Sequence, residues 1–309
     1  MTTFKTINLK KLRITPIFLV FSDEEGLSQN LAFGDILHKA VETCLHRIDE
    51  ENLKVGNAEI SFATNILAKE QIGDSKLLAD IRNAAPRGYA LSWEPAPVPK
   101  HFVLRISLFG VFAKVLPLML ARIDNIFVNQ GYNKMKFVSV YDAAMRPLQL
   151  KRAKISPVPK VIKLHDFEIP GHDVMHIALS ILSPIKLYNT QMCNFSMGFG
   201  DFVYHLLKRM VLMQYLYCDG PLTEPELFKQ ECIDLNLRVK TIKIDIALQN
   251  QKLTKGMTLE GYTGSIHYKT NLQIFNVLIP ILKIGEYLQV GSSVNYGMGK
   301  YQIDYEKCL

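Results

Sequence analysis

Residues Gly285–Ile303 read GEYLQVGSSVNYGMGKYQI and combine apolar, strand-like pieces with a run of small residues. The two pieces, Tyr287–Val290 and Tyr301–Ile303, flank a segment that is rich in glycine and serine. Glycine permits positive φ and close approach of another backbone, and the N–H and hydroxyl groups of such a loop can hold a phosphate. Lys300 adds a positive charge at the end of the loop. The pattern predicts a glycine-rich hairpin that is either a phosphate-binding surface or a plain structural turn.

Two familiar phosphate-binding loops do not fit this segment. A Walker A loop needs Gly-Lys-Ser/Thr followed by a helix, whereas Gly299-Lys300 is followed by Tyr301 and strand-like residues. The glycine fingerprint of dinucleotide-binding folds must open a βαβ unit, and this loop closes the sequence instead. We therefore expect neither a nucleotide cofactor nor any other cofactor.

Length and composition indicate a globular protein with an anionic partner. The 309 residues suit two domains of about 150 residues each, and 48% are apolar while 21% are charged. The formal charge of +7 favours nucleic acid or a membrane surface as partner, although a moderate excess of basic residues is also compatible with simple solubility.

The cysteine and histidine patterns argue against a metal site. Five widely spaced cysteines without a CxxC pair are typical of a reducing, cytoplasmic setting rather than of a zinc ribbon or a disulfide scaffold. His172 and His176 stand four residues apart, but no cysteine or carboxylate cluster completes a ligand set. The apolar runs at Ile17–Phe21 and Asn271–Ile284 are too short for a signal sequence and a membrane span, so we expect a soluble protein without a membrane partner.

The first half, residues 1–150, has the order of a ferredoxin-like domain with an insertion. Apolar residues recur with a 3.6-residue period from Phe33 to Ile48, which predicts a helix. The remaining expected elements are strands at Leu12–Phe21, Phe102–Leu108 and Met135–Tyr141 and a helix at Phe112–Gly131. A βαββαβ order results if one more strand lies within residues 53–100.

Residues 151–170 read as a basic, proline-containing linker and as the boundary between two domains. The second domain, residues 171–309, is expected to repeat the βαββαβ order. Its predicted elements are strands at Val174–Leu182, Thr241–Leu248 and Tyr262–Tyr268, helices at Gly200–Tyr217 and Leu272–Leu282, and the glycine-rich hairpin. We expect the first strand to stop at Ser183-Pro184. The predicted fold class is α+β, with two tandem ferredoxin-like (RRM-like) domains.

Four motifs in this order resemble the CRISPR-associated repeat-processing endoribonucleases of the repeat-associated mysterious protein (RAMP) superfamily. They are Ile106–Gly110 (ISLFG) with the helix and strand after it, Leu182-Ser183-Pro184, Lys208-Arg209 and the loop Val290–Tyr301. The resemblance implies a metal-independent hydrolase of antiviral defence that cuts CRISPR precursor RNA within each repeat. The ribose 2′-hydroxyl would attack the adjacent phosphate and leave a cyclic phosphate and a 5′-hydroxyl. The expected partners are CRISPR repeat RNA, the mature crRNA that stays bound as product, and other CRISPR effector subunits.

The resemblance also implies site residues. Relatives with a catalytic histidine carry it at or beside the first helix, so His38 and His46 are the catalytic candidates, the alternative being that both lie on a solvated helical face. Many relatives also have a histidine where this chain has Gln289. The residues expected to contact RNA are Lys39, Lys208, Arg209, Gly291, Ser292, Ser293, Asn295, Gly297, Gly299 and Lys300.

Two other functions remain open on the sequence. Gln289 and the lack of a clear His/Tyr/Lys cluster favour a non-catalytic RAMP subunit that binds crRNA within an effector complex. An α+β protein without any RNA role is the third alternative.

Overall fold

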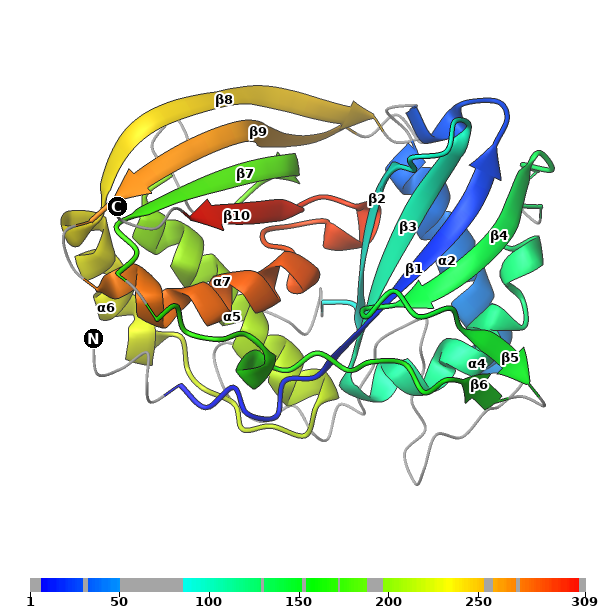
Figure 1. Ribbon diagram of the computed structural model, residues 1–309, viewed down its shortest axis with the longest axis horizontal. Helices are drawn as coiled ribbons and strands as arrows, with labels where there is room; N and C mark the ends of the chain where they lie inside the picture. The colour runs from blue at the N-terminus through cyan, green and yellow to red at the C-terminus, as the bar shows by residue number, and fades with distance from the viewer. Residues whose placement is uncertain are drawn as a thin grey trace.

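The computed structural model describes residues 7–29, 33–50, 86–128, 131–151, 154–171, 173–187, 197–252, 258–270 and 273–305. Its two four-stranded antiparallel sheets each carry helices on one face, and they lie side by side (Figure 1). The chain is an α+β protein of two tandem ferredoxin-like domains, as the sequence predicts. His172 and residues 53–85 lie outside the described residues.

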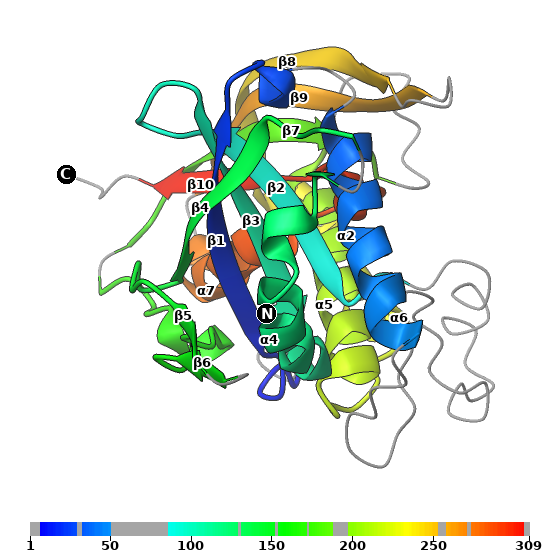
Figure 2. The ribbon, with the colours of Figure 1, turned by 90° about the vertical axis from the view of Figure 1, so that its right-hand side faces the viewer.

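The first domain comprises β1 (Ile14–Asp23), α2 (Phe33–Glu50), β2 (Tyr89–Pro95), β3 (His101–Phe109), α4 (Leu116–Leu120) and β4 (Met135–Asp142). Its strand order is β2-β3-β1-β4, which is the ferredoxin-like order. The extra strand expected within residues 53–100 is β2. Figure 2 shows α2 and α4 on one side of this sheet.

Alternating apolar residues place the core of the first domain between the sheet and its helices. Leu104 and Ile106 of β3 lie opposite Leu19 and Ile17 of β1, and all four side chains are buried. At the end of the sheet nearest to the start of α2, the Phe33 ring packs edge-on against Phe102, with ring centroids 5.1 Å apart. The helix is thereby fixed against the sheet by aromatic contacts of the kind that contribute about 0.5–1.5 kcal/mol beyond burial.

The single helix predicted at Phe112–Gly131 is wrong, because the segment breaks into short pieces. A 3-10 helix at Gly110–Val115 leads into α4, and a second 3-10 helix follows at Ile123–Asn125. Pro117 lies in the first turn of α4, where its missing N–H is tolerated. In a regular helix starting at residue 112, the same proline would lie in the interior and break a hydrogen bond, so the α-helix starts later than predicted.

The segment between the domains is more ordered than a simple extended linker. Strands β5 (Gln149–Lys151) and β6 (Lys154–Ser156) pair with each other, and a 3-10 helix spans Leu164–Asp166. The buried carboxylate of Asp142 accepts hydrogen bonds from Arg146 Nε at 2.9 Å and from Lys160 N at 3.0 Å. These bonds fasten the basic segment to the end of β4.

The second domain comprises β7 (His176–Ile185), α5 (Phe199–Tyr217), α6 (Glu226–Arg238), β8 (Lys240–Lys252), β9 (Thr258–Lys269), α7 (Ile274–Leu288) and β10 (Tyr301–Tyr305). The order β10-β7-β9-β8 repeats that of the first domain. Helices α5 and α7 cover one face of this sheet (Figure 1). Helix α6 is absent from the predicted elements, since its apolar residues form no single stripe: it buries Phe228, Cys232 and Leu235, whereas Leu227, Ile233 and Leu237 are exposed.

Two predicted boundaries in the second domain are wrong. Strand β7 continues through Ser183-Pro184 to Ile185, because its register shifts between Ile181 and Ile185 and the proline lies in that irregularity. Helix α7 contains Pro280 and extends to Leu288, so the predicted strand at Tyr287–Val290 is partly helical. The glycine-rich segment therefore joins a helix to β10 rather than closing a hairpin.

Polar contacts join the two domains. Gln214 of α5 accepts hydrogen bonds from the backbone N–H groups of Lys11 and Leu12 and donates one to Asn8 O at 2.6 Å. The Arg105 guanidinium donates from β3 to Glu286 O of α7 at 2.8 Å. Because these side chains are buried or half-buried, the contacts set the position of the end of α7, and hence of the glycine-rich loop, against the first sheet.

Candidate active site between helix α2 and the glycine-rich loop

The glycine-rich loop, residues 289–300, is held by both domains. Gln289 ends α7 at a φ of 62°, and its buried side chain donates from Nε2 to Leu91 O of β2 at 2.6 Å. On the second-domain side, Ser292 N donates to Lys186 O and Gly299 N donates to Pro184 O. The loop is thus fixed at both ends, and residues 291–293, 295 and 296 remain half-exposed between them.

Two glycines of the loop have no room for a side chain. Gly297 has a φ of +81°, and a Cβ at this position would lie 2.0 Å from the Trp93 ring. Gly299 has a φ of +84°, and its Cβ would lie 2.1 Å from Val290 O. The sequence pattern therefore reflects close packing of the loop on β2 and on itself.

The half-exposed part of the loop contacts His38 of α2. The His38 and Tyr296 rings lie with their centroids 4.1 Å apart at an angle of 50°. Asn295 Nδ2 lies 3.4 Å from His38 Nδ1, and the Tyr89 hydroxyl of β2 lies 3.3 Å from the same nitrogen. Residues from α2, β2 and the loop, far apart in sequence, thus meet at one imidazole.

A chain of hydrogen bonds fixes the protonation of His38. The Tyr89 hydroxyl donates its one proton to Glu42 Oε1 at 2.7 Å, and Arg87 pairs with the other oxygen of this carboxylate at 3.3 Å. Tyr89 can then only accept from His38, which requires that Nδ1 carries the proton and leaves Nε2 with a free lone pair. Asn295 presents its amide Nδ2 to this nitrogen, and in the opposite amide orientation its Oδ1 would accept from the same Nδ1–H.

Burial keeps His38 neutral. Only 9% of the residue is exposed. Burial, and next the positive charge of Arg87, lower the pKa of His38 to about 4. Burial and the Glu42 carboxylate raise the pKa of the Tyr89 hydroxyl, which keeps the donated proton on oxygen. The site therefore holds a neutral imidazole with a defined tautomer at pH 7.

The other predicted catalytic residue lies apart from this cluster. His46 is eight residues further along α2, about 12 Å along the helix axis, and its side chain is exposed. Lys39 lies next to His38 in sequence and forms an ion pair with Asp35 at 2.9 Å. Of the two histidines, the structure brings His38 to the loop.

The basic residues among the other predicted RNA contacts lie in different settings. Lys208 is half-buried on α5. Arg209 donates from Nε to Leu288 O at 3.0 Å, its guanidinium lies 6.0 Å from the centre of the Phe109 ring, and burial lowers its pKa to about 10. Lys300 forms an ion pair with Glu94 at 2.6 Å. Arg209 and Lys300 are thus engaged in contacts between the domains.

The site includes residues that the sequence analysis did not select. Tyr89 and Arg87 follow a stretch without clear periodicity, and Tyr296 lies inside the loop among smaller residues. Glu42 could have been found, because it stands four residues after His38 on a predicted helix and so shares its face.

Two kinds of feature are not found within the described residues. Among the described residues, we find no group of three or more His, Cys, Asp or Glu side chains that could hold a metal ion. Likewise, none of the helices in that part of the chain has the length and apolar character of a membrane span.

The comparisons with known proteins point to one family. Residues 179–301 match the model of the family described as CRISPR-associated endoribonuclease Cas6. The resemblance to CRISPR repeat-processing endoribonucleases is confirmed. This match covers most of the second domain, including the loop, while no curated protein matches the chain.

Solved Cas6 structures resemble the whole chain. A Cas6 product complex has 14% identity and a TM-score of 0.58 over 94% of this chain and 100% of that one. The Cas6 of Thermus thermophilus has 13% identity and a TM-score of 0.54 over 95% and 99%. A chain of a partial Cas6-RT-Cas1–Cas2 complex has 11% identity and a TM-score of 0.54 over 96% of this chain and 46% of its own length. At these identities the likeness shows the shared fold.

The packing of Gly297 on Trp93 can be tested by substitution. We expect Gly297→Ala to lower the free energy of unfolding by about 2–3 kcal/mol, because it combines positive φ with a steric clash. Gly26→Ala is the matched control, since Gly26 also has positive φ (+69°) but open space around it, and should cost about 1 kcal/mol. Urea unfolding measures both, and equal losses would contradict close packing at Gly297.

Proposed function

We propose that this chain is an endoribonuclease that cleaves CRISPR repeat RNA at the site formed by His38 and the glycine-rich loop. The observation that carries the proposal is the contact of His38 with Asn295 and Tyr296. The loop lies within the segment that matches Cas6, while His38 comes from the other domain. Support also comes from the net charge of +7, which suits an anionic substrate.

The proposed reaction needs a base, positive charge and a fixed substrate. His38 Nε2 takes the proton of the ribose 2′-hydroxyl, the 2′-oxygen forms a bond to the adjacent phosphorus, and the bond to the 5′-oxygen breaks. The leaving 5′-oxygen receives a proton from the imidazolium or from water. The products are a 2′,3′-cyclic phosphate and a 5′-hydroxyl, and no metal takes part in these steps.

Neighbouring groups supply the remaining requirements. Tyr89 holds Nδ1–H, so that Nε2 is the nitrogen free to act. Lys39 and backbone N–H groups of residues 293–295 would face the phosphate, where positive charge and N–H groups stabilise the developing negative charge. The phosphate of bound RNA would in turn raise the pKa of His38 from about 4 towards the operating pH.

We further infer that the product remains bound and that the protein acts in the cytoplasm. The cleaved RNA keeps its sugar-phosphate contacts to the loop, because the cut removes none of them. A bound crRNA would allow other CRISPR subunits to join. A Cas6 fold occurs within a Cas6-RT-Cas1–Cas2 complex.

A non-catalytic crRNA-binding subunit is the second candidate function. It is favoured by the low exposure of His38 and by Gln289, whose side chain is committed to Leu91 O instead of facing a substrate. Tight, salt-sensitive binding of repeat RNA without cleavage would distinguish this function from the first.

Substitution of each histidine tests the catalytic assignment. We expect purified protein in EDTA to cut repeat RNA once per repeat, and His38→Ala to slow single-turnover cleavage by about 10²–10⁴-fold. His46→Ala is the matched control on the same helix and should stay within about twofold of wild type. Uncut RNA at stoichiometric wild-type protein would refute cleavage, and full activity of His38→Ala would exclude His38 as the base.

The pH dependence of cleavage tests the state of His38. A base acts only when unprotonated, so kcat/KM should rise through the pKa of about 4 in the free protein and be level from about pH 6 to 8. Tyr89→Phe keeps the ring but loses the acceptor for Nδ1–H, and we expect about tenfold slower cleavage with unchanged RNA affinity. A midpoint near 6.5 in wild type, or full activity of Tyr89→Phe, would be inconsistent with the buried, oriented imidazole.

A further inference from the structure

A pocket with a mainly apolar lining lies beside the glycine-rich loop, between the two domains. Its volume is about 440 Å³, within the range of small-molecule sites. Trp93 and Pro95 line it from β2, Pro184 from β7, Gln249 and Asn250 from β8, and Lys300 from the end of the loop. Lys300 is already an expected RNA contact, but neither the proposed chemistry at His38 nor the resemblance to Cas6 assigns a role to these other residues.

Trp93 is a fixed aromatic surface in this pocket. The indole Nε1 donates to Ser28 O at 3.2 Å, and the ring packs edge-on against Phe33 with centroids 5.5 Å apart. Gly297 lies against the same ring and leaves no space for movement in its direction. The indole nevertheless remains half-exposed, so it is oriented before any ligand arrives.

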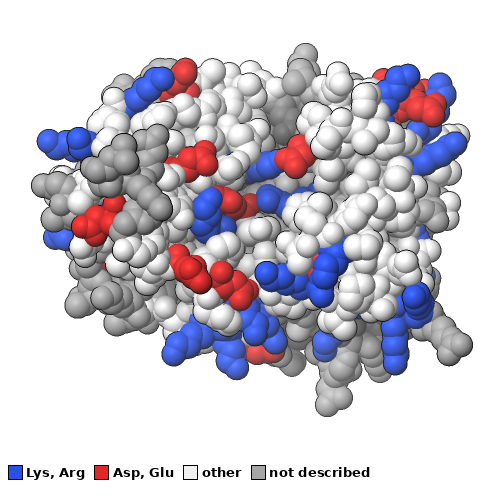
Figure 3. Space-filling view, viewed as in Figure 1, with Lys and Arg blue, Asp and Glu red and all other residues white. Residues whose placement is uncertain are grey.

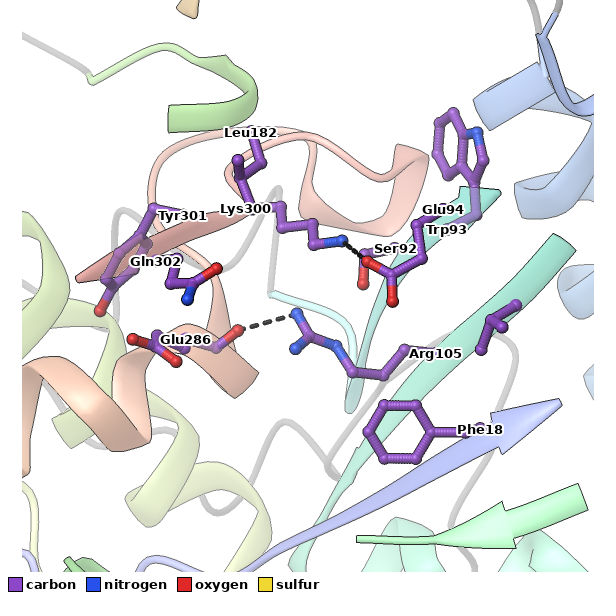
Figure 4. A pocket seen from close by; sticks show the side chains of 11 residues that line it. Phe18, Ser92, Trp93, Glu94, Arg105, Leu182, Glu286, Lys300, Tyr301 and Gln302 are labelled. Carbon is purple, nitrogen blue, oxygen red and sulfur yellow. Dashed lines mark hydrogen bonds and ion pairs between the residues drawn. The ribbon is translucent and has the colours of Figure 1, made fainter. Parts of the chain in front are cut away.

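The pocket continues into a smaller cleft of about 150 Å³ that Trp93 also lines. Figure 4 shows the indole at the far end of this cleft, beyond the ion pair of Lys300 and Glu94. Figure 3 shows the corresponding depression between the two halves of the molecule, bordered by side chains of both charges. Mixed charge argues against a site for a bare phosphate, whereas a neutral, flat ligand would fit it.

The chemistry of the lining matches an unpaired nucleobase. Any base can stack on an indole, and such stacking contributes about 1–3 kcal/mol per base. The exposed amides of Gln249 and Asn250 offer both hydrogen-bond donors and acceptors, as a base edge requires. Gly297 and Lys300 belong both to the loop and to the pocket, so a strand on the loop would pass next to Trp93.

We propose that this pocket binds one unpaired base of the RNA, stacked on Trp93 and contacted at its edge by Gln249 and Asn250. The inference rests on the proposed function, because it takes RNA as the ligand. It adds a specificity-determining position outside the reacting bond. Since a base in a duplex cannot enter such a pocket, the bound nucleotide must be single-stranded.

Trp93 is the one tryptophan of the chain, so emission excited at a wavelength that its 13 tyrosines do not absorb reports on this pocket. We expect repeat RNA with a 2′-deoxy substitution at the cleavage position to quench the emission of the wild-type protein. A series of the same RNA with one abasic position at a time should contain a single position that abolishes the quenching and weakens binding about 5–100-fold.

Variants then separate stacking from folding. Trp93→Leu should bind the intact RNA about 5–100-fold more weakly than wild type, and its affinity should not fall further when the critical base is removed. Trp93→Tyr should retain most of the wild-type affinity. Unchanged fluorescence on RNA binding, or equal abasic effects in wild type and Trp93→Leu, would overturn the pocket assignment while leaving cleavage at His38 intact. Absence of both binding and cleavage in wild type would instead refute the proposed function, and the pocket assignment with it.

Discussion

The docking of the glycine-rich loop on β2 is the constraint on which the rest of this structure depends. Gln289 turns the chain out of α7 at a φ of 62° and donates to Leu91 O, and Gly297 lies directly on the Trp93 ring. Both bonding groups of the first contact are buried, so loss of either would leave a polar group without water or partner, at a cost of about 1–3 kcal/mol. The loop therefore has one position relative to the first domain.

That position creates the environment of His38. Without Asn295 and Tyr296 above it, the imidazole would be one side chain on the flank of α2 and would have ordinary contact with water. With the loop in place, the ring is largely buried, its pKa is lowered to about 4, and Tyr89 sets its tautomer. The catalytic competence that we propose is thus a property of the two-domain arrangement and cannot be ascribed to either domain alone.

The sequence predicts those parts of the fold that local periodicity determines. The apolar stripe of α2, the alternation in β3 and the span of α5 agree with the structure because their burial follows from residues near in sequence. The glycines of the loop were also informative, since positive φ and close approach leave few other choices. Helix α6 is not predicted because its few buried residues form no clear apolar stripe, and α7 runs to Leu288, beyond the predicted end at Leu282, with Pro280 accommodated inside it.

The site was less predictable than the fold. The resemblance selects both His38 and His46 as candidates, and nothing local distinguishes them, since both lie on α2 and only packing of a distant loop separates them. Arg209 was expected to contact RNA, whereas its guanidinium donates to Leu288 O within the second domain and lies against Phe109 of the first. Tyr89 gave no signal because its role depends on Glu42 and His38, which β2 meets only in the folded domain.

The most direct test of this account is an NMR titration of the His38 imidazole in the free, full-length protein, assigned with a His38→Gln variant. We expect a pKa near 4 and, at pH 7, the neutral tautomer with the proton on Nδ1. A His38 pKa near 6.5, or a proton on Nε2, would show that the loop does not cover the ring in solution, and would contradict the site as described.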